Sequence, residues 1–345
     1  MKNKTWNIAI LKGDGVGPEV IDAAISVLDS IKDSYGIHIN YRFATAGFNC
    51  IEKYGTNLPQ NTIKILKDMD CVLKGPMTTP ETPGTPVSAA VQIRKMFDLY
   101  ANIRPAKNIK GVSSFKTGVD LVIVRENTEG MYSGKELMIN DDTAIGMRII
   151  TRKATERIAR FAFELAMKRK KHLTYVHKQN ILKLSDGLFN DVILSVGNKF
   201  KKVHLDGAHI DAMAQWLIKQ PENYDVIVTE NLFGDILSDE SAMLVGGMGI
   251  APGANIGDNY AMFEPVHGSV PKYAGKDKVN PIATVRSIKM MLDWMGFEEE
   301  ALTIEKAIGI LVNEKNTLTY DLGGNAKCSQ VGDRLAEIIS RISIH

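Results

Sequence analysis

The chain has 345 residues, of which 44% are hydrophobic and 24% are charged, and its formal net charge is +2. This length allows two domains, and the composition is that of an ordinary globular protein. The near balance of acidic and basic residues excludes the long-range positive field that steers nucleic acid or anionic lipid to a protein. No apolar run reaches the roughly 20 residues that span a bilayer. We therefore expect no nucleic acid and no membrane as a partner.

The cysteines and the N-terminus bear on the compartment. Residues 1–5 lead directly into a strand-like run at 6–11, so we expect no signal or transit peptide, although a chain from which one had been removed would look the same. Cys50, Cys71 and Cys328 are odd in number and widely spaced, without the pairing of a metal site. We expect reduced, mostly buried thiols in a cytoplasmic protein.

Short apolar runs alternate with amphipathic stretches along the whole chain. The pattern predicts strands at 6–11, 37–44, 71–74, 119–125, 143–151, 173–177, 203–206 and 226–229. It predicts helices near 18–33, 59–68, 88–97, 153–171, 181–197, 210–218, 235–245, 281–295 and 298–313. This alternation favours an α/β fold with substantial parallel pairing. The stretches 75–86 and 246–257 are rich in glycine and proline and are expected to be mobile loops.

The first strand is followed by a glycine-rich turn at 13–18, which opens a helix. The dinucleotide-binding fingerprint needs a glycine three residues after its second glycine. Here Pro18 stands three residues after Gly15. The segment therefore predicts a tight strand-to-helix turn and not a Rossmann site.

Several side chains along the middle of the chain suit an acidic substrate. Arg94, Arg104 and Arg125 could hold carboxylates through planar, bidentate contacts. Each of them alone is more commonly a surface or ion-pair residue. Tyr132 and Lys178 are candidate proton carriers, and Lys178 follows an apolar strand, where burial can lower the pKa of a lysine.

Asp235 and Asp239 lie four residues apart on a predicted helix, just after the strand 226–229. Residues at this spacing share one helix face. Two hard oxygen ligands at the end of a strand suit Mg²⁺ or Mn²⁺, although an isolated pair of this kind is more commonly a solvated acidic face. The glycine-rich segments 249–257 and 264–275 are either ordinary surface loops or places where a phosphate approaches backbone N–H groups.

Taken together and in this order, these segments resemble the β-decarboxylating dehydrogenases, which include isocitrate, 3-isopropylmalate and homoisocitrate dehydrogenases. The most specific motifs are Asn-Leu-Phe-Gly-Asp-Ile-Leu-Ser-Asp at 231–239 and Ala-Pro-Gly-Ala-Asn-Ile-Gly-Asp at 251–258. The resemblance implies a non-Rossmann, two-domain α/β fold. Residues 1–99 and 250–345 would form the large cofactor-binding domain. Residues 100–249 would form a small domain that carries the dimer interface and the metal and substrate residues.

The resemblance also implies a homodimer that shares its active sites and catalyses metal-dependent oxidative decarboxylation. Tyr132 and Lys178 would be catalytic, and Asp211, Asp235 and Asp239 would bind Mg²⁺ or Mn²⁺, with Lys178 and Asp211 reaching the site of the neighbouring subunit. The implied substrate-binding residues are Ser88, Arg94, Arg104, Arg125, Tyr132 and Lys178. The implied cofactor-binding residues are Thr78, Asn180, Glu264, His267, Gly268, Lys272, Tyr273, Val279, Asn280 and Tyr320.

The resemblance favours NADP over NAD, because Lys272 and Tyr273 stand where NAD-preferring relatives have an Asp-Ile pair. An arginine that NADP-dependent relatives carry is replaced by Gly323 and Gly324. Ser88 matches a serine that contacts isocitrate, and the expected order of substrates is isocitrate, homoisocitrate, 3-isopropylmalate. A non-catalytic regulatory subunit is a second hypothesis, but the residues for metal binding and proton transfer are all present.

Overall fold

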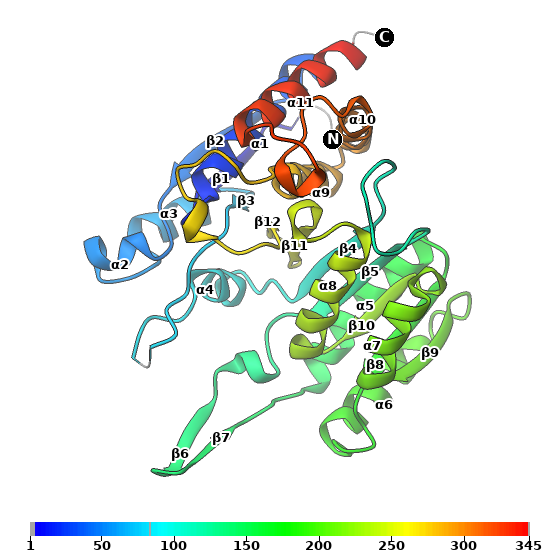
Figure 1. Cartoon of the computed structure of the whole chain (residues 1–345). Coiled ribbons are helices and arrows are strands. Elements are labelled where there is room, and N and C mark those ends of the chain that lie inside the picture. The colour runs from blue at the N-terminus through cyan, green and yellow to red at the C-terminus, as the bar shows by residue number, and fades with distance from the viewer. Residues whose placement is uncertain (1–3, 83, 344–345) are drawn as a thin grey trace.

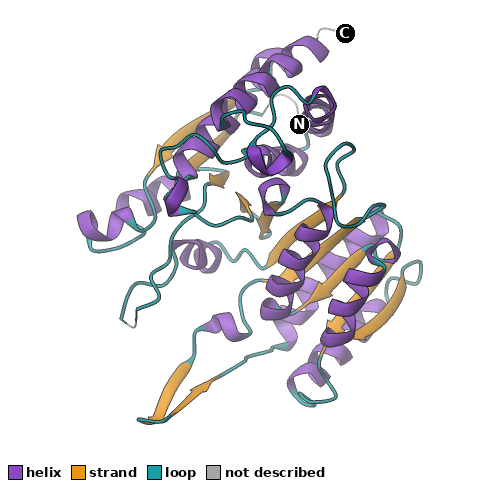
Figure 2. Cartoon of the chain, viewed as in Figure 1, coloured by secondary structure: helices purple, strands orange, loops and turns teal. Residues whose placement is uncertain are grey.

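The computed structural model describes residues 4–82 and 84–343. Across these residues a ten-stranded sheet is flanked by helices, and a separate two-stranded arm projects from the body (Figures 1 and 2). The strands of the large sheet are β1 (Trp6–Leu11), β2 (Ile39–Ala44), β3 (Cys71–Lys74), β4 (Ala101–Lys107), β5 (Asp120–Glu126), β8 (His172–His177), β9 (His204–His209), β10 (Val226–Thr229), β11 (Pro252–Ile256) and β12 (Ala261–Pro265). The arm consists of β6 (Glu136–Asn140) and β7 (Thr143–Gly146).

The helices follow the predicted alternation with the strands. They are α1 (Gly17–Tyr35), α2 (Asn49–Tyr54), α3 (Gln60–Asp68), α4 (Ala89–Met96), α5 (Arg152–Lys168), α6 (Ser185–Gly197), α7 (Ile210–Lys219), α8 (Asn231–Val245), α9 (Ile282–Met295), α10 (Glu298–Glu314) and α11 (Cys328–Ile342). Short 3₁₀ turns are η1 (Met131–Ser133), η2 (Pro221–Asn223), η3 (Met248–Ile250), η4 (Pro271–Tyr273) and η5 (Tyr320–Leu322). In the described part of the chain, no helix is both long and apolar enough to cross a membrane.

The sheet order is β2-β1-β3-β12-β11-β4-β5-β10-β8-β9. Parallel pairs form both ends of the sheet, whereas β12, β11, β4 and β5 pair antiparallel in its middle. The predicted α/β fold is confirmed. One half of the sheet comes from residues 6–74 and 252–265, and the other half comes from residues 101–229. This division follows the two proposed domains, whose bounds stay a prediction.

Two predicted segments differ from the structure, and the strands β4 and β12 and the helix α11 were not predicted. The expected strand 143–151 is a strand only over 143–146, and it pairs with the unpredicted β6 in an arm whose residues are all exposed. The expected loop 246–257 contains β11, which is buried between β12 and β4. Helix α11 was not predicted, and its Gly332 lies so close to Ala23 of α1 that a Cβ there would be 2.8 Å from the Ala23 backbone.

Candidate active site

Helix α8 begins directly after β10 and carries the two predicted metal ligands. Its N-terminus is capped by the carboxylate of Glu230, which accepts hydrogen bonds from the backbone N–H groups of Leu232 and Phe233. Helix α8 packs so closely on β5 that a Cβ at Gly234 would lie 2.7 Å from the Cβ of Arg125. Glycine at 234 therefore allows Asp235 to lie beside Arg125.

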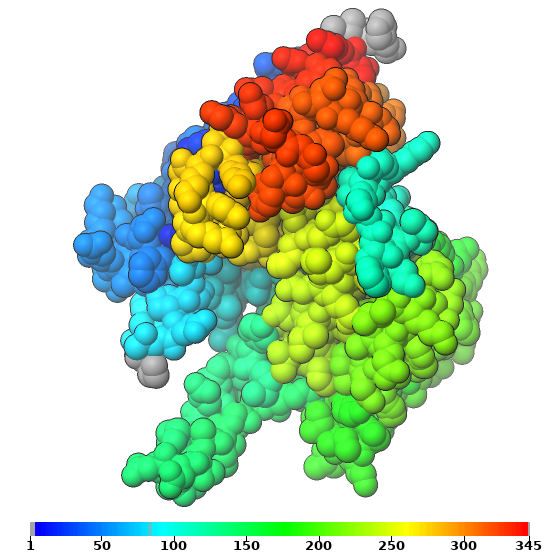
Figure 3. All heavy atoms as spheres, viewed as in Figure 1, coloured from blue at the N-terminus to red at the C-terminus, as the bar shows by residue number. Residues whose placement is uncertain are grey.

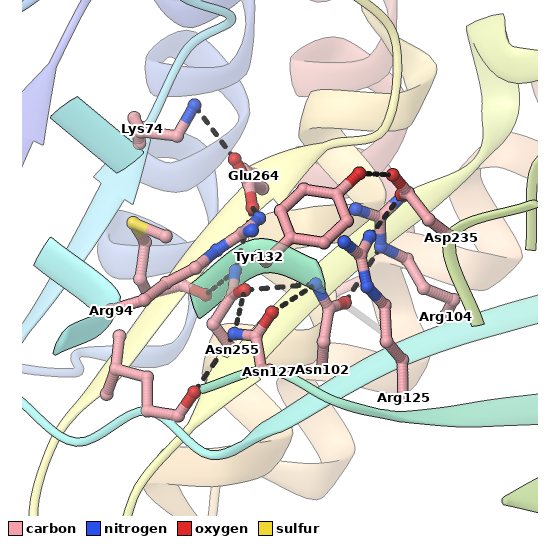
Figure 4. A network of polar contacts seen from close by, with 12 residues as sticks. Lys74, Arg94, Asn102, Arg104, Arg125, Asn127, Tyr132, Asp235, Asn255 and Glu264 are labelled. Carbon is pink, nitrogen blue, oxygen red and sulfur yellow. Dashed lines mark hydrogen bonds and ion pairs between the residues drawn. The ribbon is translucent and has the colours of Figure 1, made fainter. Parts of the chain in front are cut away.

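Arg125, Tyr132 and Asp235 form a compact polar group (Figure 4). The Asp235 carboxylate accepts hydrogen bonds from the Arg125 guanidinium and from the Tyr132 hydroxyl. Arg125 is 1% exposed, and burial followed by the nearby arginines lowers its pKa to about 10. Burial, together with the hydrogen bond to Asp235, raises the pKa of Tyr132, so its phenol keeps its proton at neutral pH.

A second group of charges lies around Glu264 at the end of β12. The Glu264 carboxylate forms ion pairs with Lys74 at 2.8 Å and with Arg94 at 3.0 Å, and all three residues are buried. Burial alone would raise the pKa of Glu264, but the cations Lys74, Arg94 and Arg104 outweigh it and hold this pKa far below its usual range. Glu264, expected to bind the cofactor, is in this chain the counter-ion of a predicted substrate arginine.

Three asparagines connect the two groups, and the sequence pattern did not identify them. The Asn102 side chain donates to Asn127 and to Asn255, and the Asn255 amide donates to Glu264 at 2.8 Å. The Asn102 carbonyl in turn accepts a hydrogen bond of 2.8 Å from Nε of Arg104. Through Asn102, this amide network holds the guanidinium of Arg104. Asn102 and Asn255 lie inside otherwise apolar strands and Asn127 directly follows one, which was their only signal in the sequence.

Asp235 and Asp239 provide a donor set that fits Mg²⁺ or Mn²⁺. They lie one turn apart on α8, and their side chains are 33% and 50% exposed, so both reach solvent. Burial raises the pKa of Asp239, and the like charge of Asp235 adds to this shift. Within residues 4–82 and 84–343 of one chain, no third His, Cys, Asp or Glu completes a compact group with this pair.

Lys178 and Asp211 lie at the ends of β8 and β9 and contact each other. The Lys178 ammonium donates to Asp211 at 2.5 Å, and this hydrogen bond is the main cause of a lowered pKa of Asp211. Contacts within the described chain do not connect this pair to Asp235. That both side chains enter the active site of a neighbouring subunit stays a prediction.

Three loops meet where the cofactor is expected to bind. Thr78 Oγ1 lies 2.6 Å from Ser269 Oγ, and its backbone N–H donates to Asp14 at 2.9 Å. The predicted tight turn is observed: Gly15 has φ of +59°, and a Cβ there would lie 2.0 Å from the Ser269 carbonyl oxygen. His267 is buried, burial lowers its pKa, and its Nε2 has no hydrogen-bond partner among the described residues.

Several of the remaining predicted cofactor residues lie around two tyrosines. The Tyr273 and Tyr320 rings are 6.0 Å apart, and the ammonium of Lys278 lies 5.3 Å and 4.8 Å from their centres. Lys272 lies 5.1 Å from the Tyr273 ring. Val279 and Asn280 are buried beside this group, Gly268 and Asn180 are exposed, and Ser88 is half-buried at the start of α4.

The fold and the charges of this site are those expected of an α/β enzyme that acts on an acidic substrate. Comparison with known proteins specifies it further: residues 7–335 match the isocitrate/isopropylmalate dehydrogenase family. The homoisocitrate dehydrogenase of Methanocaldococcus jannaschii is 44% identical over 97% of this chain and 98% of its own length. The isocitrate/homoisocitrate dehydrogenase of Thermus thermophilus is 43% identical over 98% of this chain and 99% of its own length.

A solved isocitrate dehydrogenase from Methylococcus capsulatus superposes with a TM-score of 0.93 at 38% identity, covering 97% of this chain and all of that one. The chain therefore belongs to the isocitrate/isopropylmalate dehydrogenase family. It is an NAD(P)-dependent β-decarboxylating dehydrogenase, and the reaction of its family is the metal-dependent oxidative decarboxylation of a hydroxy acid.

Proposed function

We propose that this enzyme decarboxylates isocitrate to 2-oxoglutarate with NADP as the oxidant. The observation that carries the proposal is the convergence of Arg94, Arg104 and Arg125 beside Asp235, seen in Figure 4. All three arginines are buried, and Arg125 Nη2 and Arg94 Nε have no hydrogen-bond partner among the described residues. Such donors suit a substrate with several carboxylates, and each charge-assisted contact contributes about 1.5–3 kcal/mol.

The side chains of this site have separate tasks in that reaction. Asp235 and Asp239, completed by Asp211 of the partner subunit, would hold Mg²⁺ or Mn²⁺, which would supply a Lewis acid next to the substrate hydroxyl and carboxylate. The arginines orient the carboxylates. Tyr132, whose phenol is protonated at neutral pH, donates the proton that the product carbon requires. Lys178, positioned by Asp211, assists removal of the hydroxyl proton in the partner subunit's site.

Unpaired cations support the choice of NADP. Lys272, Lys276, Lys278 and Lys327 have no carboxylate within 4.0 Å in the described part of the chain, and the first three surround the Tyr273 ring. A cavity of about 350 Å³, lined in part by Lys276, Lys278, Lys327 and Tyr320, opens where Gly324 replaces the missing arginine. Clustered cations favour a 2′-phosphate, so they offset the loss of that arginine.

Homoisocitrate is the second candidate substrate. Relatives that act on it include the proteins of M. jannaschii and T. thermophilus named above. Ala90 in α4 lacks the polar side chain that isocitrate-specific relatives usually present, which leaves room for one more methylene. A 3-isopropylmalate/3-methylmalate dehydrogenase of M. jannaschii is also 44% identical, so 3-isopropylmalate belongs in the same test.

Steady-state kinetics test the assignment. The purified enzyme is assayed with Mn²⁺, each of isocitrate, homoisocitrate, 3-isopropylmalate, malate and tartrate, and each of NADP and NAD. We expect the highest kcat/KM with isocitrate and NADP. Rapid turnover of another acid, with none of isocitrate, would refute the substrate assignment.

Cofactor choice is tested by substitution. The double variant Lys272→Asp with Tyr273→Ile should shift the ratio of kcat/KM values toward NAD, because a carboxylate repels a 2′-phosphate. Lys110→Asp is the matched control, since Lys110 is another exposed lysine that has no carboxylate partner within residues 4–82 and 84–343. An unchanged ratio in the double variant would contradict the NADP assignment.

We further propose a homodimer that shares its active sites, located in the cytoplasm. The arm β6–β7 stands away from the body in Figure 3, and it exposes Leu137, Met138, Ile139 and Ile145. An isolated two-stranded ribbon is marginally stable in water, so this arm requires a partner surface. Helices α7 and α8 expose further apolar side chains: Trp216, Ile218, Ile236 and Met243. The three free cysteines are buried, as expected of a reduced compartment.

A further inference from the structure

A cluster of potential metal ligands lies on the edge strand β9 and its neighbour β8, outside the site described above. His172 and His204 are directly opposite each other in the parallel pairing of these strands. Asp206 lies two residues after His204, so it shares the same face of the sheet. The ligand atoms of His172, His204 and Asp206 all lie within 4.8 Å of one another.

The distances suit a single small ion. His172 Nε2 is 3.1 Å and His204 Nε2 is 4.0 Å from Asp206 Oδ2. Zinc bonds of about 2.0–2.2 Å in a tetrahedral site separate the ligand atoms by roughly 3.3–3.5 Å. Small rotations reach that geometry, and the His204 side chain, 73% exposed, is free to make them. Asp206 Oδ1 is shielded from solvent and has no hydrogen-bond partner among the described residues, so this carboxylate is incompletely satisfied.

We propose that His172, His204 and Asp206 form a binding site for a divalent transition-metal ion of the Zn²⁺, Ni²⁺ or Cu²⁺ class. Two imidazoles and one carboxylate are ligands that these ions prefer, whereas Mg²⁺ prefers oxygen. The exposed Lys171 and Lys202 beside the site have no carboxylate within 4.0 Å among the described residues, and their positive charge repels an ion that is bound by electrostatic attraction alone. The site should therefore bind these transition-metal ions in preference to Mg²⁺, which is expected at Asp235.

The position in the fold gives the ion a structural effect. His172 and His204 begin the two strands, and Lys178 and Asp211 follow their other ends, roughly 20 Å away. The ion would join the edge strand β9 to β8 without contacting those two residues. Because it would bind the folded chain and not the unfolded one, it would raise the melting temperature, and this rise would grow with the logarithm of the ion concentration above the dissociation constant.

The test removes the other metal site first. The full-length variant Asp235→Asn with Asp239→Asn is titrated with Zn²⁺ by calorimetry in excess Mg²⁺, and one ion per chain is expected. Adding His204→Gln should weaken that binding at least about ten-fold, because even the loss of a residue that only supports a ligand costs this much. His38→Gln, at an exposed histidine outside the cluster, is the matched control and should leave it unchanged.

Electron paramagnetic resonance with Cu²⁺ gives an independent readout. The spectrum should show coupling to imidazole nitrogens, which a site of aspartates cannot produce, and His204→Gln should remove part of it. If His204→Gln were poorly folded, His172→Gln would serve in its place. Absence of Zn²⁺ binding, equal binding in the His204 and His38 variants, or binding lost only in His209→Gln would overturn the proposal.

Discussion

Gly234 offers the sharpest test of how helix α8 positions the metal ligands. Replacing glycine by alanine inside a helix stabilises it by about 1 kcal/mol. In Gly234→Ala, however, the new methyl lies 2.7 Å from Cβ of Arg125 and 3.2 Å from its Cα, well inside the 3.5–4.0 Å of normal carbon contacts. Overpacking of this kind costs about 1–3 kcal/mol, so the net effect should be a destabilisation of about 0–2 kcal/mol.

The activity of Gly234→Ala should fall far more than its stability. Helix α8 must move outward by about 1 Å, and displacements of that size at a reacting centre reduce rates about 100-fold. Guanidinium unfolding, Mn²⁺ affinity and kcat/KM are measured together. Gly309→Ala in α10 is the control, because its Cβ meets no atom within 4 Å, and it should be stabilised by about 1 kcal/mol with full activity. Identical behaviour of the two variants would refute the reasoning.

Three further predictions concern charge and assembly. Glu264→Gln should cost about 3–5 kcal/mol in urea unfolding at neutral pH, because its buried cations lose their counter-ion. The pKa of Glu264 is lower in the folded protein than in the unfolded chain, where it is near 4.5. The stabilisation from its ionised carboxylate is therefore complete above pH 4.5 and is lost as the pH falls below that value. The difference in free energy of unfolding between the wild type and Glu264→Gln should shrink accordingly in acid. Asp235→Asn should lower Mn²⁺-dependent turnover at least about 100-fold while the exposed Asp191→Asn does not, and equal rates would contradict the ligand role. Met138→Asp should yield monomers by light scattering, whereas Phe115→Asp, at an apolar residue that is even more exposed, should not. A Met138 variant that stays dimeric would show that the arm is not part of the interface.

The sequence predicted much of the fold because most strands and helices carry a clear periodicity. It failed for β11 and β12, where buried strands lack the alternation of a half-exposed sheet and glycine and proline indicate loops. It also missed the arm strand β6, whose exposed apolar residues have no core in the same chain to pack on. These errors arise where burial depends on neighbours that are distant in the sequence or on another molecule.

For the candidate active site, too, part of the arrangement follows from the sequence and part only from the tertiary structure. The sequence alone determined that Asp235 and Asp239 share a helix face, because that follows from the pitch of one helix. It also supplied the arginines and the family motifs. Only the tertiary structure decided that Glu264 neutralises Arg94 and Lys74, and that Asn102 of β4, which holds Arg104, is itself bonded to Asn255 of β11. Those contacts join segments more than a hundred residues apart, and the sheet order, which no local pattern encodes, brings them together.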